Sequence, residues 1–314
     1  MRAMILGAGL GTRLRPLSDL RPKPAVPVRG LPLIAYPLAL LARHGVSEVV
    51  INVHHKPAAL IDAAERHAPP GLRVRFSHEE SLLGTGGGIR RAAAFLRESD
   101  PCLVLAGDML LDVDLGALIG EHRRQGSAWT LLLRDDPRGA SFGTIGVDAT
   151  GRIRRIARRF DLGGEQRAGL YAHATVMAAR AFDTMPGREA FGHLDGWIAP
   201  LLQAGAGDVR AELLGPAQCV WEPVGSPAEY LAANLHPPAL SFLDPDVRAR
   251  AEGTRFAPGL VIGAGAEIGA GARLEDVVVW DGERVPAGLH ARRGVFAGGR
   301  FHPCTDPDVE DAAA

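Results

Sequence analysis

Residues 4–18 read Met4-Ile5-Leu6-Gly7-Ala8-Gly9-Leu10-Gly11-Thr12-Arg13-Leu14-Arg15-Pro16-Leu17-Ser18, and Arg21-Pro22-Lys23-Pro24 follows at once. A short apolar run ends here in three closely spaced glycines. Glycine adopts backbone angles that are closed to other residues, so the N–H groups of such a turn can converge on an anion. The segment therefore predicts a phosphate-binding loop at the end of the first strand.

Two basic side chains lie close to this loop in the sequence. Arg13 offers a planar guanidinium, and Lys23 offers a compact ammonium whose neighbouring prolines hold the backbone extended. The chain has only one other lysine, Lys56, and arginine carries the remaining positive charge. A lysine kept in such a chain indicates a position that needs a point charge.

Composition and charge narrow the class of protein. The chain has 314 residues, 46% of them hydrophobic and 23% charged, which favours one large α/β domain with a smaller unit. Its net charge of −1 gives no reason to expect nucleic acid or a membrane surface as a partner. Without a recognisable signal peptide or an apolar run of transmembrane length, the expected location is the cytoplasm.

The three cysteines do not suggest a disulfide framework or a metal site. Cys102, Cys219 and Cys304 are odd in number, widely spaced and without a C-x-x-C pair. This pattern predicts neither disulfides nor a zinc site.

Strand-like apolar runs alternate with helical patterns over the first half of the chain, which favours parallel βαβ units. The predicted elements are a helix over about 33–44, a strand over 46–53, a helix over 56–67, and strands over 72–77 and 102–106. Ligands of such sheets bind outside the carboxyl ends of the strands. We therefore expect the glycine loop and Asp108, which follows the last of these strands, to meet in one crevice.

The last quarter has a different pattern. Apolar residues stand six apart with Gly-Ala-Gly between some of them, at Phe256, Ile262, Ile268, Leu274 and Trp280. Hexapeptide spacing is typical of a β-helix, and we expect two to three incomplete coils; a glycine-rich β appendage is the alternative. The predicted organisation is an α/β domain over 1–235, a linker over 236–252, the coils over 253–304 and a disordered tail over 305–314.

The glycine motif resembles that of the sugar-1-phosphate nucleotidyltransferases, also called nucleotide-sugar pyrophosphorylases. Their signature reads G-x-G-T-R-L-x-P-L-[ST], followed by P-K-P, and residues 9–18 and 22–24 match it without a gap. The resemblance covers about residues 1–235 and is closest to mannose-1-phosphate guanylyltransferase-like NDP-sugar synthases. It implies a Rossmann-like, mixed and mostly parallel sheet, with a short left-handed β-helix at the C-terminus that serves subunit contact or regulation.

A second segment carries the resemblance to the nucleotide side. Residues 79–89 resemble the family motif E-x-x-L-G-T-A-G-x-L, in which a loop reads the base and the next helix N-terminus faces the nucleotide. The Glu79 carboxylate suits guanine, which presents two donors on one edge, so GTP is favoured; a solvated acid is the alternative. The expected nucleotide-binding residues are Leu6, Gly7, Ala8, Gly9, Gly11, Thr12, Glu79, Gly84 and Thr85.

The resemblance also implies the catalytic and metal-binding residues. Arg13 and Lys23 would be catalytic, holding the pyrophosphate and the phosphate under attack, and Asp108 would bind Mg²⁺ together with substrate phosphates. Arg159 and Gly169 would meet the sugar phosphate. Such a reaction is direct nucleotidyl transfer, which requires no serine, cysteine or general base because the attacking phosphate oxygen is already anionic.

Three positions depart from the family pattern. Pro223 stands where the motif W-x-D-[IV]-G-T-P has a second metal-binding aspartate, and its neighbour Glu222 is expected to face the opposite side of the strand. Arg158-Arg159-Phe160 replaces the E-K-P segment. His173 stands where the family commonly has a small residue, and a lone histidine is usually a packed or solvated residue.

Three interpretations follow. The first is an enzyme that transfers a nucleoside monophosphate from an NTP, GTP favoured, to a sugar-1-phosphate, mannose-1-phosphate favoured. The second is a catalytically weakened regulatory homologue that binds nucleotide or sugar nucleotide. The third, a dinucleotide-dependent oxidoreductase, lacks an acid for the ribose at the end of the second strand, where Asn52-Val53-His54 stands. A homo-oligomer formed through the C-terminal domain is the expected assembly.

Overall fold

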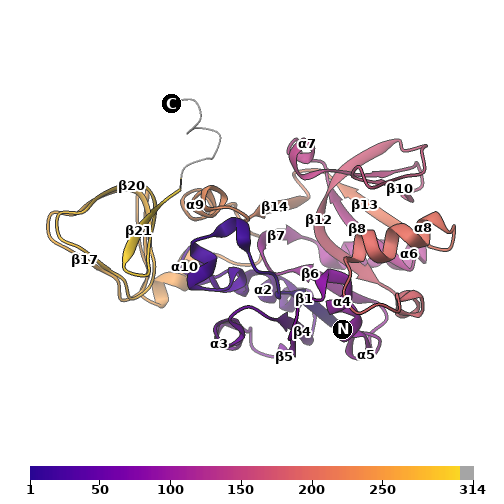
Figure 1. Cartoon of the computed structure of the whole chain (residues 1–314), viewed down its shortest axis with the longest axis horizontal. Coiled ribbons are helices and arrows are strands. Elements are labelled where there is room, and N and C mark those ends of the chain that lie inside the picture. The colour runs from indigo at the N-terminus through magenta and orange to yellow at the C-terminus, as the bar shows by residue number, and fades with distance from the viewer. Residues whose placement is uncertain (305–314) are drawn as a thin grey trace.

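The computed structural model describes residues 1–304, in which a large α/β unit carries a smaller β unit at one end (Figure 1). Residues 305–314, where a disordered tail was predicted, lie outside the described residues. Within residues 1–304, no helix is long and apolar enough to cross a membrane.

A mixed sheet forms the centre of the large unit. Its main path runs β11-β10-β9-β12-β6-β1-β4-β5, and β8 pairs with both β12 and β13. Strands β6, β1, β4 and β5 are parallel, whereas β12 lies antiparallel to β6 and β8. The strands are β1 (Arg2–Leu6), β4 (Glu48–Val53), β5 (Arg73–His78), β6 (Cys102–Ala106), β8 (Trp129–Arg134), β9 (Ile145–Val147), β10 (Ile153–Ile156), β11 (Phe160–Asp161), β12 (Arg167–Met177) and β13 (Val209–Leu214). The predicted mostly parallel α/β sheet is confirmed.

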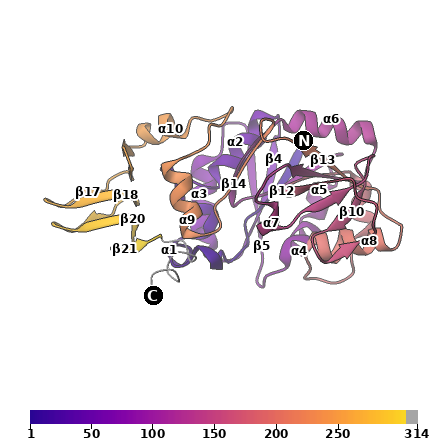
Figure 2. The ribbon, with the colours of Figure 1, turned by 90° about the horizontal axis from the view of Figure 1, so that it is seen from above.

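Helices cover both faces of this sheet, as Figure 2 shows with α2 and α6 on one side and α4 and α8 on the other. This explains why β4 and β6 are buried along their whole length, and why β6 is wholly apolar and β4 is apolar except at Glu48 and Asn52. The helices are α2 (Ala35–Arg43), α3 (Pro57–His67), α4 (Gly84–Arg91), α5 (Ala93–Leu96), α6 (Leu115–Gln125) and α8 (Ala199–Gln203). The predicted helices and strands of the first half agree with these bounds to within about two residues at each end.

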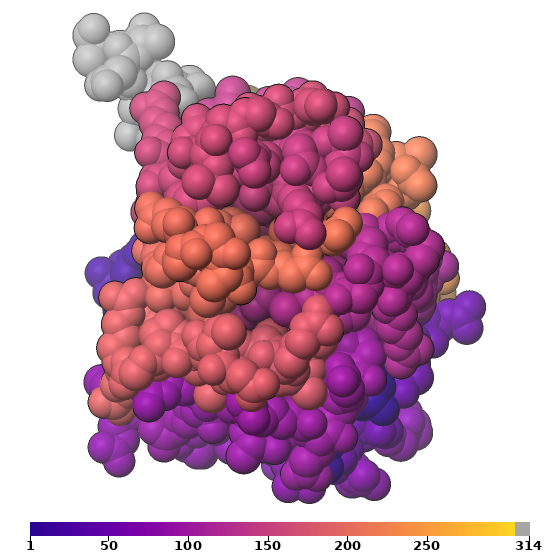
Figure 3. Space-filling model, turned by 90° about the vertical axis from the view of Figure 1, so that its right-hand side faces the viewer, coloured from indigo at the N-terminus to yellow at the C-terminus, as the bar shows by residue number. Residues whose placement is uncertain are grey.

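Shorter elements complete the large unit. They are η1 (Thr12–Leu14), α1 (Leu17–Leu20), η2 (Lys23–Ala25), β2 (Pro27–Val28), β3 (Leu31–Pro32), β7 (Met109–Val113), α7 (Gly139–Phe142), η3 (Ala179–Thr184), η4 (Leu194–Ile198), β14 (Cys219–Pro223) and α9 (Pro227–Leu235). Strand β7 pairs antiparallel with β14, which places Pro223 opposite Met109. Figure 3 views the end far from the small unit, where the salmon surface of η4 and α8 lies between the purple first half and the magenta β9–β12 segment.

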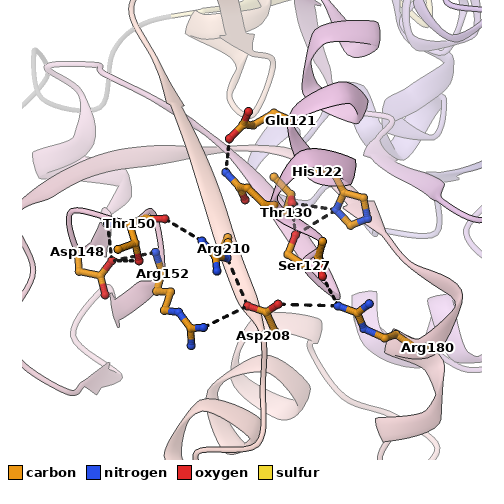
Figure 4. Close-up of polar contacts among 12 residues, drawn as sticks. Glu121, His122, Ser127, Thr130, Asp148, Thr150, Arg152, Arg180, Asp208 and Arg210 are labelled. Atoms are coloured by element: carbon orange, nitrogen blue, oxygen red, sulfur yellow. Dashed lines mark hydrogen bonds and ion pairs between the residues drawn. The ribbon is translucent and has the colours of Figure 1, made fainter.

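Polar contacts beside α6 tie this end of the sheet together (Figure 4). The buried His122 ring accepts or donates a 2.9 Å hydrogen bond with Thr130 Oγ1, and burial lowers its pKa to about 4. Asp208 pairs with arginines from three segments, Arg152, Arg180 and Arg210. These contacts explain part of the arginine usage as sheet and loop stabilisation.

The small unit consists of parallel coils. Strands β16, β18 and β20 stack with partners seventeen residues apart, such as Val261, Val278 and Val295, and β17 pairs with β19 at the same interval. Residues with positive φ turn the corners at the same interval, including Gly265 and Gly282. The strands are β15 (Arg255–Ala257), β16 (Leu260–Ile262), β17 (Glu267–Ile268), β18 (Arg273–Val279), β19 (Arg284–Val285), β20 (His290–Ala297) and β21 (Arg300–Pro303).

The coil interior differs from the hexapeptide prediction. Each coil is one residue shorter than three hexapeptides, so Val279 rather than Trp280 stacks on Ile262 inside it. Trp280 and Phe256 instead pack against the large unit. The six-residue series that includes Phe256 and Trp280 therefore does not describe the coil interior, because the coils repeat every seventeen residues.

Buried hydrogen bonds and an ion pair join the two units, which also line a shared cavity of about 460 Å³. Trp280 Nε1 donates to Tyr230 Oη at 2.9 Å, and Tyr230 Oη donates to the Pro27 carbonyl at 2.5 Å. The segment predicted as a linker contains helix α10 (Pro245–Ala251), whose Asp246 forms an ion pair with Arg29. The coils are therefore fixed to the large unit by buried side chains and by charge.

Candidate functional site

The glycine loop that follows β1 presents free backbone donors. Among hydrogen bonds within residues 1–304, the amides of Ala8, Gly9, Gly11 and Thr12 have no acceptor, whereas the Gly7 amide donates to Asn52 Oδ1 at 2.8 Å. Several backbone N–H groups without an acceptor along one loop edge form a concave set of donors that is suited to an anion.

Gly11 is required at its position by both conformation and space. Its φ is +62°, and a Cβ there would lie 3.0 Å from the Cβ of Lys23. A side chain would therefore strain the turn and push Lys23 away. This glycine brings the loop and the lysine segment into contact.

Asn52 joins the glycine loop to the segment that begins at Glu79. Its Oδ1 accepts from the Gly7 amide, and its Nδ2 donates to Glu79 Oε1 at 2.7 Å. Glu79 Oε2 accepts from the Leu83 amide at 3.1 Å, and both side chains are buried. Glu79 is thus a structural bridge as well as a cavity residue, which its sequence motif did not reveal.

The N-terminus of α4 is partly satisfied by the protein itself. The amides of Gly86 and Gly87 donate to the Phe191 carbonyl at 2.9 and 3.2 Å. The Thr85 hydroxyl is hydrogen-bonded to His193 Nδ1 at 2.7 Å, and burial lowers the pKa of His193 to about 3. The prediction that the N-terminus of α4 faces the nucleotide therefore concerns only the backbone amides that precede Gly86.

Lys23 and Asp108 form an ion pair in the middle of the site. Lys23 Nζ lies 2.8 Å from Asp108 Oδ2, the lysine is 7% exposed, and the aspartate side chain is 45% exposed. Burial alone would raise the pKa of Asp108, but the charge and hydrogen bond of Lys23 outweigh it and hold that pKa below its usual value. Asp108 is therefore an ionised carboxylate that faces the cavity.

The donors present fit a Mg²⁺ ion held by one protein carboxylate. Asp108 Oδ1 has no hydrogen-bond partner within residues 1–304, and Mg²⁺ commonly takes one or two carboxylates together with phosphates and water. No cluster of three or more ligating side chains occurs in that range. The substrate would therefore have to complete the shell.

Pro223 lies next to this carboxylate. It pairs with Met109, the residue after Asp108, and the adjacent Glu222 is engaged by Arg138 at 2.8 Å. Neighbouring residues of a strand face opposite sides, so Glu222 does not replace a missing ligand. The loss of a second metal-binding carboxylate at Pro223 stays a prediction.

These groups line one cavity of about 490 Å³. It brings together all the predicted catalytic, nucleotide-binding and metal-binding residues, which are Leu6, Gly7, Ala8, Gly9, Gly11, Thr12, Arg13, Lys23, Glu79, Gly84, Thr85 and Asp108. The cavity also contains Asn52, Leu82 and Gly225, which no sequence motif indicates as site residues, and His173, for which the sequence favours a packed or solvated position.

The two predicted sugar-phosphate residues lie elsewhere. Arg159 is exposed and pairs with Asp195 at 3.2 Å. Gly169 is covered by Leu213, which a Cβ would approach to 2.4 Å. Neither lines the cavity, so Gly169 has a packing role here and the assignment of Arg159 stays a prediction.

Comparison with known proteins identifies the fold and the family. The family model described as nucleotidyl transferase matches residues 2–238. The chain belongs to the nucleotidyl transferase family. Its glycine loop, Lys23 and Asp108 therefore lie in the matched region.

Individual relatives of this nucleotidyl transferase differ in substrate. A mannose-1-phosphate guanylyltransferase of Mycobacterium tuberculosis is 34% identical over 309 residues, covering 93% of this chain and 83% of that one. A UTP–glucose-1-phosphate uridylyltransferase of Synechocystis is 32% identical, but covers 49% of this chain and 42% of its own. The crystal structure of HddC from Yersinia pseudotuberculosis with GMP-PN has a TM-score of 0.60 at 24% identity, over 74% of this chain and 97% of that one, which shows the shared fold.

Asn52 offers a test of the bridge between the two loops. Asn52→Ala is expected to raise KM for the nucleotide about ten- to hundredfold, because the glycine loop loses the side chain that orients it. It should also lower the free energy of unfolding by roughly 1–3 kcal/mol, since Glu79 is left buried with an unused oxygen. Steady-state kinetics and a thermal melt measure both effects, and unchanged values would contradict the bridging role.

Proposed function

We propose that this protein transfers a guanylyl group from GTP to a sugar-1-phosphate, with mannose-1-phosphate favoured, and releases pyrophosphate. The observation that carries the proposal is a single cavity in which unpaired loop amides meet Arg13, Lys23 and the ionised Asp108. The mannose-1-phosphate guanylyltransferase relative and the GMP-PN complex of HddC support the choice of base.

In the proposed reaction, the charge and position of each residue set its role. The loop amides and Arg13 hold the β- and γ-phosphates that leave, and Lys23 neutralises the phosphate under attack. Mg²⁺ held at Asp108 would supply charge neutralisation to the nucleotide oxygens. The acceptor phosphate oxygen attacks the α-phosphorus in line, so the protein acts by positioning and electrostatics.

Glu79 is the proposed base-reading residue. Both of its oxygens already accept one hydrogen bond from the protein, which fixes the carboxylate in place. Each carboxylate oxygen can accept a second bond, so the two donors on the guanine edge can still be satisfied. A fixed carboxylate would reject adenine, whose corresponding nitrogen is an acceptor.

A second candidate function is a weakened, nucleotide-binding regulatory homologue. Pro223 favours it, because the strand beside Asp108 offers no second carboxylate to the metal. A dinucleotide-dependent oxidoreductase is not supported, since the Asn52 side chain at the end of β4 is already bound to the glycine loop and Glu79.

The proposal is tested by pyrophosphate release with GTP, ATP and UTP, each with several sugar-1-phosphates, with and without Mg²⁺. We expect the highest kcat/KM with GTP and mannose-1-phosphate, and loss of turnover without the metal. A preference for ATP or UTP would refute the role of Glu79. Binding of GTP without release would establish the regulatory alternative.

Restoring the missing carboxylate gives a further prediction. Pro223→Asp should lower the Mg²⁺ concentration for half-maximal turnover about tenfold or more, because a second charge is added beside Asp108. Pro223→Ala, which removes the proline without adding a charge, is the matched control. Equal magnesium dependence in both variants would show that position 223 does not face the metal.

We also propose that the coils form a left-handed β-helix through which copies of the chain associate, and that the protein is cytoplasmic. A hollow of about 700 Å³ on the coils, lined by apolar residues such as Ile262 and Leu274 and by charged ones such as Arg273 and Glu275, supports an association surface. Sedimentation of the purified protein at several concentrations tests the association.

A further inference from the structure

His173 has a backbone conformation that a side chain makes costly. Its φ is +52° in the middle of β12, between the buried residues Ala172 and Ala174. The pairing of β12 with β8 shifts register between Tyr171 and Thr175, so the histidine lies on a bulge. Strain of this kind persists only where the surrounding structure holds it, and it concentrates at functional sites.

A rigid aromatic platform orients the ring. The centroids of the His173 and Tyr171 rings lie 4.6 Å apart. The Tyr171 hydroxyl is fixed in turn by Thr175 Oγ1 at 2.6 Å and His193 Nε2 at 3.2 Å. The contact with the Tyr171 ring therefore holds the His173 imidazole in a defined orientation.

In the part of the chain that the structure describes, the two imidazole nitrogens of His173 have no hydrogen-bond partner that would explain a histidine at this position. Within residues 1–304 neither ring nitrogen makes a hydrogen bond, and the side chain is exposed to the cavity that also contains Arg13, Lys23 and Asp108. Folding alone would favour glycine at this φ. A ligand that uses the free nitrogens accounts for a histidine.

The strand order indicates which ligand this is. Reading the sheet from β5 through β4, β1 and β6 to β12 gives Glu79, Asn52, the glycine loop, Asp108 and finally His173. Under the proposed function, the base lies at the first of these residues, the triphosphate at the glycine loop and the metal at Asp108. In-line attack requires the acceptor on the side of the α-phosphorus opposite the leaving pyrophosphate, toward β12.

We propose that His173 is a specificity-determining residue that hydrogen-bonds the sugar-1-phosphate acceptor, an inference that rests on the proposed function. The ring has a donor and an acceptor nitrogen when neutral, which matches a sugar hydroxyl. The cavity lining includes neither Pro223 nor Arg159. His173 thus supplies a polar contact on the acceptor side.

The test compares His173→Gly and His173→Asn with wild type. Glycine removes the ring and relieves the backbone, whereas asparagine tolerates a positive φ and keeps a donor and an acceptor. We expect the glycine variant to raise KM for the sugar-1-phosphate about tenfold while KM for GTP stays within about twofold. The asparagine variant should retain part of the acceptor affinity, and the preference among sugar-1-phosphates should weaken most with glycine.

Two further measurements keep the inference separate from the proposed function. The thermal midpoint of His173→Gly without ligands should not fall, because the strained residue is gone. Calorimetric binding of mannose-1-phosphate in the presence of GTP should weaken about tenfold in that variant, whether or not the wild type turns over. His236→Asn, at the exposed C-terminal end of α9, is the control and should change nothing.

Equal acceptor binding and an unchanged sugar preference in His173→Gly would overturn the inference. A change confined to KM for GTP would place His173 on the nucleotide instead and would also overturn it, as would a wild type that binds no sugar-1-phosphate. Absence of pyrophosphate release with normal, His173-dependent acceptor binding would refute the proposed transfer alone.

Discussion

Asp108→Asn is expected to reduce the rate of pyrophosphate release about 10²- to 10³-fold, the cost of losing one charge contact in a pre-organised site. The asparagine has nearly the same size and can still accept a hydrogen bond from Lys23, so the fold should survive. The lost negative charge is the one that would hold Mg²⁺ against the nucleotide phosphates. Steady-state pyrophosphate release at saturating substrates and a thermal melt measure the two effects.

Asp183→Asn is a suitable control for this variant. Asp183 carries a surface ion pair with Arg97 at 2.8 Å, and its side chain is 66% exposed. Removing that charge should leave the rate unchanged, since exposed ion pairs contribute little. A wild-type rate in Asp108→Asn would remove the aspartate from the mechanism.

Lys23→Met is expected to lower turnover by a similar factor of about 10² or more. The variant removes a cation from the phosphate under attack and leaves the Asp108 carboxylate without its partner. Because that pair is largely enclosed, breaking it should also reduce stability, by about 3 kcal/mol if the site behaved as fully buried and by less with Asp108 half exposed. Kinetics and denaturant unfolding separate the loss of rate from the loss of stability.

The chain contains its own matched control. Lys56 is the other lysine of the sequence, and its side chain is exposed at the start of α3. Lys56→Met should keep both rate and stability. If Lys23→Met kept its rate while losing stability, Lys23 would be a structural partner of Asp108 and not a phosphate contact.

The central part of the site was predictable from the sequence because its chemistry is local. Three glycines after an apolar run, a lysine between prolines and an aspartate after a buried strand each indicate a role without reference to distant residues. The parallel strand order then brings them to one edge of the sheet. The predicted loop, Lys23 and Asp108 accordingly meet in one cavity.

The remaining features depend on contacts between distant segments. Asn52 was noticed only as an unsuitable ribose ligand, but the fold places it between Gly7 and Glu79. The Phe191 carbonyl, about a hundred residues away in sequence, satisfies the amides of α4. His173 was judged an ordinary histidine, because its positive φ and its bulge follow from pairing with two neighbouring strands.

The most direct test of the account is a crystal structure with a non-hydrolysable GTP analogue and Mg²⁺. We expect the triphosphate against the amides of Ala8, Gly9, Gly11 and Thr12, with the metal on Asp108 as its sole protein carboxylate. A nucleotide bound elsewhere, or a metal held without Asp108, would contradict it.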